Sequence, residues 1–90
     1  MKFYVQSIEQ INAEGGAHSE YSKSEKVNDY NSALTKFYDK LSNVAADLGK
    51  AHTFMFIEIV NSTGAQVKKD AVGDYIDDDI QPEPEPETEG

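Results

Sequence analysis

Only one segment of this chain has the length and spacing of an amphipathic helix, and it lies in the middle, from Asn28 to Lys50. Its apolar side chains recur every three or four residues, which places them on one face of a 3.6-residue helix. They are Tyr30, Leu34, Phe37, Tyr38, Leu41, Val44, Ala45 and Leu48. We expect Asn28 to cap the first turn, Gly49 to adopt the left-handed conformation at the far end, and Leu41 to matter most within the stripe.

Two segments before the helix have strand character. Residues 2–11 alternate apolar side chains between two faces, and residues 17–23 are suited to a solvated edge strand. The five residues 12–16 between them, NAEGG, contain adjacent glycines that accept positive φ without steric cost. The sequence therefore predicts a β-hairpin ahead of the helix.

A second hairpin is predicted after the helix. Residues 53–60, TFMFIEIV, give the strongest strand signal of the chain, and the turn at 61–64 leads into a returning strand at 65–72. In that last strand we expect Val67 to point inward and two lysines, Lys68 and Lys69, to protect the edge.

These elements predict an α+β fold with the order β-β-α-β-β. A helix that carries the chain back along the sheet sets the third strand beside the first, which gives the strand order 2-1-3-4, entirely antiparallel. The helix then packs on one face of the four-stranded sheet. The strands that are richest in apolar residues then lie in the centre of the sheet.

The net charge of -9 is concentrated in one stretch. Residues 77–90 hold seven acids and no lysine, which leaves ten acids against eight lysines, a balance of -2, in residues 1–76. We expect a single domain over 1–76 and a disordered acidic Pro/Glu tail over 77–90. All the cations are lysine, and without the bidentate fork of arginine direct nucleic-acid binding is not expected.

No combination of residues indicates an enzyme. The two histidines, His18 and His52, are interpreted as surface residues, and the acidic run at Asp74 and 77–79 lacks the glycine and the closing glutamate of a calcium loop. No catalytic residue, metal site or cofactor is predicted. With no cysteine, no apolar run of membrane-spanning length and no signal-like start, we expect a soluble, cytoplasmic protein that does not contact a membrane.

Residues 53–60 carry apolar side chains on both faces, and one helix can cover only one of them. The candidate interface residues divide into two sets, Phe54, Phe56 and Val60 on one side and Met55, Ile57 and Ile59 on the other. We expect the uncovered set to join two chains in a homodimer. The alternative is a monomer in which the segment around Tyr75, Ile76 and Ile80 folds back over the open face.

The pattern Ala33-Leu34, Phe37-Tyr38 and Lys40-Leu41, followed by a strand that an Asn-x-x-Gly turn closes at Gly64, resembles small uncharacterised proteins of prophages and conjugative elements in Gram-positive gut bacteria. The resemblance covers about half of the chain and implies a mobile-element context without supplying a catalytic residue. We therefore expect a non-enzymatic protein-interaction module with an unknown protein partner. The alternative is an acidic inhibitor that imitates nucleic acid to block a defence or DNA-processing enzyme.

Overall fold

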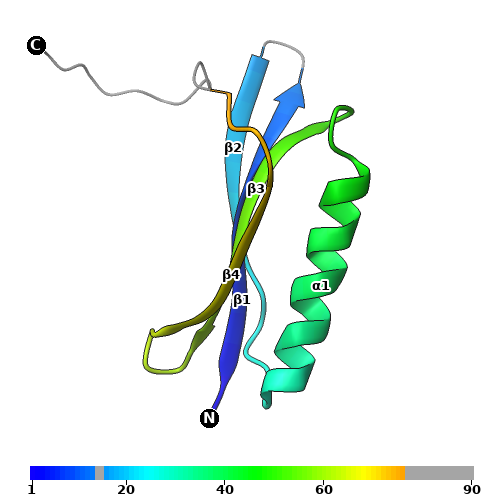
Figure 1. Ribbon diagram of the computed structural model, residues 1–90. Coiled ribbons are helices and arrows are strands. Elements are labelled where there is room, and N and C mark those ends of the chain that lie inside the picture. Colours follow the sequence, from blue (N-terminus) through cyan, green and yellow to red (C-terminus); the bar gives the residue numbers. More distant parts are fainter. Residues whose placement is uncertain (14–15, 77–90) are drawn as a thin grey trace, which may run out of the picture.

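The predicted order of elements is present in the computed structural model, which describes residues 1–13 and 16–76 (Figure 1). The elements are β1 (Phe3–Ala13), β2 (Gly16–Lys23), α1 (Tyr30–Ala46), β3 (His52–Asn61) and β4 (Gln66–Gly73). The strands form one sheet in the order β2-β1-β3-β4, and every neighbouring pair is antiparallel. The α+β fold and the strand order expected from the sequence are confirmed. The predicted disordered tail, residues 77–90, lies outside the described residues.

Helix α1 packs on one face of the sheet, across β1, β3 and β4 (Figure 1). The core between them consists of seven buried apolar residues, Val5, Ala33, Phe37, Val44, Met55, Ile57 and Ile59. The backbone of α1 does not approach β2, so the helix side of this edge strand is left uncovered. Within the described part of the chain, no helix is long and apolar enough to cross a membrane.

The helix is shorter than its periodicity predicts, and its ends differ from the expected ones. Its N-cap is Asp29, in an extended conformation and without a side-chain capping bond, so the expectation for Asn28 is wrong. The helix ends at Ala46, because the carboxylate of Asp47 turns to bind the following segment. Gly49 does adopt a left-handed φ of 82°, but it does so in the turn beyond the helix cap.

Phe37, and not Leu41, is the centre of the helix stripe. Phe37 is fully buried, whereas Leu41 packs at the margin of the core and is only partly buried. The tyrosines assigned to the stripe, Tyr30 and Tyr38, are exposed because the stripe is wider than the area of sheet that it covers. Tyr38 instead meets the edge of the Phe37 ring, at 5.2 Å between ring centroids.

The expectation that Val67 points inward is wrong. On β4 the positions opposite the core residues Met55, Ile57 and Ile59 are Val72, Asp70 and Lys68, so Val72 packs against the core. Val67 alternates with these positions, lies at the register shift between Ile59 and Val60, and is 42% exposed. Gln66 is then the residue opposite Val60.

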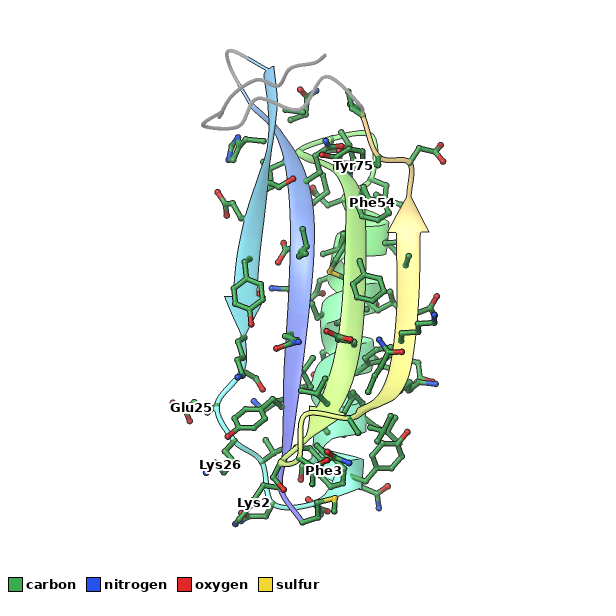
Figure 2. The ribbon with its side chains drawn as sticks, turned by 90° about the vertical axis from the view of Figure 1, so that its left-hand side faces the viewer. Lys2, Phe3, Glu25, Lys26, Phe54 and Tyr75 are labelled. Carbon is green, nitrogen blue, oxygen red and sulfur yellow. The ribbon has the colours of Figure 1, made fainter. Side chains whose placement is uncertain are left out.

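The far face of the sheet carries no helix in the described structure, and Figure 2 looks directly onto it, with α1 behind the strands. We call it the open face. After β4 the segment 74–76 turns across its upper end. There the Tyr75 ring meets Phe54 edge-on, with ring centroids 5.7 Å apart (Figure 2).

Candidate functional site

A polar bridge lies on the helix side of the sheet, between the end of α1 and strands β1 and β3. We use this name for Glu9, Lys40, Asp47 and His52. The two ring nitrogens of His52 face two carboxylates, Nδ1 at 2.8 Å from Asp47 Oδ2 and Nε2 at 2.8 Å from Glu9 Oε1. The other oxygen of Glu9 binds Lys40 Nζ at 2.7 Å. The bridge thus joins the helix, the turn that follows it and two strands.

The bridge favours the charged forms of His52, Glu9 and Asp47. Burial by itself disfavours the His52 imidazolium, but hydrogen bonds to Asp47 and Glu9 outweigh it, so the pKa of His52 is raised. Burial likewise acts to raise the pKa of Glu9, yet Lys40 and His52 lower it. The hydrogen bond from His52 lowers the pKa of Asp47. An imidazole that donates from both nitrogens is protonated, since the neutral ring has only one N–H.

This arrangement does not suit His52 to proton transfer. A general base needs one ring nitrogen free to face a substrate, and here both nitrogens are occupied by carboxylates. Only 19% of the His52 side chain is exposed, so the interpretation of this residue as a surface histidine is wrong. The described part of the chain contains no group of three or more His, Asp or Glu side chains arranged to hold a metal ion. The polar bridge is a structural connection.

His18, the other histidine, lies on β2 opposite Ile11, two strands from His52, which faces the same residue from β3. Its ring meets Glu20 at 3.0 Å on an exposed surface. The sequence places neither Glu9 nor Lys40 in a site. The available signal is that Glu9 shares the inward face of β1 with Val5 and Ser7, where a carboxylate requires a partner.

A groove of about 470 Å³ lies beside the bridge, where α1 leaves β2 uncovered. Strand β1, strand β2 with the residue after it, and α1 line this groove with Val5, Ser7, Ser22, Lys23, Ser24, Lys36, Asp39, Lys40 and Asn43. The charges of this lining are compensated: Lys40 is paired with Glu9, Lys36 stands beside Asp39 in the lining, and the ammonium of Lys23 lies over the Tyr4 ring, 4.3 Å from its centroid. The serines are already engaged: Ser7 and Ser22 bond to each other at 2.9 Å, and Ser24 accepts the Val5 N–H.

The open face presents a row of apolar side chains that crosses all four strands. Cross-strand pairing sets Tyr21 of β2 beside Ile8 of β1, Ile8 beside Phe56 of β3, and Phe56 beside Ala71 of β4. We call these four residues the apolar row. Tyr21 is 62% exposed and Ile8 is 44% exposed. The row is therefore a continuous apolar strip open to solvent.

A polar row lies next to the apolar row on the same face. It consists of Lys23, Gln6, Glu58 and Lys69, in strand order. Gln6 donates to Glu58 at 2.6 Å, and Tyr21 donates to Gln6 at 3.0 Å. These bonds link the polar row to the apolar row and fix the orientation of the Tyr21 ring.

The six candidate interface residues fall on the two faces as two sets. Met55, Ile57 and Ile59 are fully buried under α1 and belong to the core. The alternation along β3 puts the other set on the open face, where Phe54 lies against Tyr75 and Phe56 belongs to the apolar row. Val60 is only 8% exposed. The alternation along residues 2–11 already groups Ile8 with Tyr4 on one face of the strand, whereas Tyr21, the most exposed member of the row, is not among the candidates, because sequence alone does not show which strand positions share a row.

No family model, curated protein or solved structure matches this chain. The link to mobile genetic elements expected from the sequence therefore stays a prediction.

Proposed function

We propose that this protein is a non-enzymatic protein-interaction module that acts through the open face of its sheet and forms a homodimer there. The observation that carries this proposal is the apolar row. Single exposed apolar side chains are ordinary on a protein surface, whereas a contiguous strip is typical of an interface. Here the strip crosses every strand of the sheet, with Ile8 and Tyr21 as its most exposed members.

The neighbouring polar row supports self-association. It has a carboxylate, Glu58, between two lysines, Lys23 and Lys69. A twofold axis brings the same patch of both chains together, so each patch must complement itself in charge and in shape. A surface that carries both an apolar strip and charges of both signs meets that condition. The rim of such an interface is usually polar.

The segment 74–76 limits the extent of this interface. Tyr75 and Ile76 lie over the Phe54 end of the open face, so the alternative in which this segment folds back applies to that end. Ile80, the third residue of that alternative, lies outside the described residues. The apolar row below Phe54 is what remains for a second chain.

Sedimentation equilibrium tests the dimer. The chain has a mass of 10.0 kDa, and we expect twice that mass at tens of micromolar, with dissociation on dilution. Ile8→Glu should shift the protein to the monomer, because a charge at the centre of the row must be desolvated on association. A monomer mass for the unchanged protein at every concentration would overturn the proposal.

Val67→Glu is the matched control. It introduces the same charge at another exposed apolar position, on β4 and outside the row. We expect it to leave the dimer intact. Circular dichroism of both variants shows whether the fold is kept. If Val67→Glu and Ile8→Glu weaken the dimer equally, the effect is one of net charge and the open face is not the interface.

A further inference from the structure

The short segment after β4 folds back over one end of the open face, and we call residues 74–76 the strap. It is attached to the neighbouring strand, β3, at two points. The Asp74 N–H donates to the Thr53 carbonyl at 3.0 Å, and the Tyr75 ring lies edge-on against Phe54 (Figure 2). The strap thus runs from the edge of the sheet, at β4, across β3 and toward β1.

At its far end the strap is held by the side chain of Gln10, on β1. The Ile76 N–H donates to Gln10 Oε1 at 2.8 Å, and Gln10 Nε2 donates to the Ile76 carbonyl at 2.9 Å. Gln10 is completely buried, and Thr53 Oγ1 donates to the same Oε1 at 2.6 Å. A buried carboxamide requires hydrogen-bond partners, and here the backbone of the strap supplies two of the bonds.

The strap is a peripheral layer of the fold. Asp74 is exposed, and Tyr75 is 43% exposed. No residue of the strap belongs to the core cluster between α1 and the sheet. Segments with few buried apolar side chains open locally at a lower free energy than the core does. The strap can therefore leave the open face while the four strands and α1 stay folded.

We propose that the strap is an autoinhibitory cover, which limits the homodimer while it is closed and strengthens the homodimer when it opens. This inference rests on the proposed dimer through the open face. Two sheets that pack face to face lie about 10 Å apart, and side chains of both sheets fill the space between them. Over Phe54 that space is already occupied by the Tyr75 ring, whose centroid lies 5.7 Å from that of Phe54. A second sheet reaches packing distance at this end only after the strap has moved away, and it then gains contact with an aromatic side chain beside the apolar row.

The variant Ile76→Pro should open the strap and leave the side chains of Phe54, Gln10 and Tyr75 unchanged. Proline has no N–H for Gln10 Oε1, and its ring occupies the position of the missing hydrogen. Hydrogen exchange of the Gln10 side-chain amide measures the opening in dilute, monomeric protein. We expect slow exchange in the unchanged protein and faster exchange in Ile76→Pro. Equal exchange in the two proteins would show that these hydrogen bonds do not hold the strap, and it would overturn the proposal.

Sedimentation equilibrium on the full chain then measures the effect on the dimer. Loss of one hydrogen bond changes an equilibrium about two- to tenfold, and a dimer contains two straps. The dissociation constant of Ile76→Pro should therefore be lower than that of the unchanged protein by roughly four- to a hundredfold. Ile76→Ala is the comparison variant, because it loses the side chain but keeps the N–H and the carbonyl that bind Gln10. We expect a smaller change for Ile76→Ala, and circular dichroism shows whether both variants keep the fold.

The outcomes distinguish failure of this inference from failure of the dimer itself. If the unchanged protein dimerises and Ile76→Pro associates no more tightly, the strap does not inhibit, and the dimer stands without it. If both proteins stay monomeric at every concentration, the dimer and the inference fail together. Adding Ile8→Glu to Ile76→Pro should return the protein to the monomer, because the tighter association uses the open face. Tight association that survives Ile8→Glu would lie elsewhere on the protein and would overturn the inference.

Discussion

The two faces of the sheet differ sharply, although the same strands supply both. On the helix side Met55, Ile57 and Ile59 are completely buried under α1. On the open face the neighbouring positions of the same sheet leave Ile8 44% and Tyr21 62% exposed. Strand alternation alone would make the two faces of β3 nearly equal in apolar content. The placement of the helix makes one face a core and the other a surface.

This difference separates the residues that stabilise the fold from those that we propose take part in association. Burial of large apolar side chains on the helix side supplies the main driving force for folding. The open face, with its partly exposed side chains, contributes less to folding. Substitutions on the two faces should therefore affect different measurements, and four experiments test this, in descending order of the effect on stability that we expect.

The first test, with the largest expected effect, makes the same substitution of isoleucine by alanine on opposite faces of the sheet. Ile57→Ala, on the helix side, should lower the free energy of unfolding by about 2–5 kcal/mol, because it leaves a cavity in a closed core. Ile8→Ala removes the same atoms from the open face and should cost below about 1 kcal/mol in dilute monomer, since its side chain is already partly solvated. Urea unfolding measures both. Equal costs would show that the open face is part of the core.

The second test concerns the point where the chain passes from the edge of the sheet to the open face. Gly73 has a φ of 81°, and a Cβ built there would lie 2.3 Å from the Thr53 carbonyl oxygen. Gly73→Ala should cost more than the 1–2 kcal/mol or so of a left-handed alanine, because backbone must move as well. Gly64→Ala, at a φ of 92° with open space around it, is the control for the dihedral term alone. A Gly73→Ala cost no larger than that of Gly64→Ala would show that the contact relaxes freely.

The sequence was sufficient for the fold because its pattern is local. Apolar alternation over 53–60 and helical spacing over 28–50 fix the type of each element, and the β-β-α-β-β order then allows few sheet topologies. Register is different. The shift between Ile59 and Val60 depends on packing across β3 and β4, and nothing local to Val67 reveals that it turns outward.

The candidate site was less predictable for the same reason. His52 and Glu9 are 43 residues apart, and their contact exists only after β1 and β3 have paired. The groove likewise results from the lateral position of α1, which covers three strands and leaves β2 uncovered. Helical periodicity gives the direction of a face but not the strands that it covers. The polar bridge and the groove are thus properties of the assembled sheet.

The third test concerns the Tyr75 ring, which packs on Phe54 at one end of the open face. Tyr75→Ala removes a ring that packs edge-on against Phe54 and is itself 43% exposed, so we expect a loss of about 0.5–1.5 kcal/mol. Tyr75→Phe keeps the ring contact and is the matched control. Amide exchange near Phe54 should increase in the alanine variant. No change in exchange at Phe54 would mean that the ring does not protect this end.

The last and smallest effect is the pH dependence that the polar bridge gives to the helix side. The pKa of His52 is raised above its usual 6.5, so its contribution to stability is present below about pH 6.5 and is lost as the pH rises through the folded-state value. The pKa values of Glu9 and Asp47 are lowered from 4.5 and 3.8, so their contributions are present above those values and are lost as the pH falls through the folded-state ones. The bridge therefore stabilises the fold most between about pH 5 and 6.5.

The variant His52→Gln tests this window. The free energy of unfolding of the unchanged protein minus that of His52→Gln should be largest between about pH 5 and 6.5 and decrease toward pH 8. His18→Gln, at the exposed contact with Glu20, is the control for removal of an imidazole. A difference between the unchanged protein and His52→Gln that stays constant from pH 5 to 8 would show that the two carboxylates do not hold His52 in its charged form.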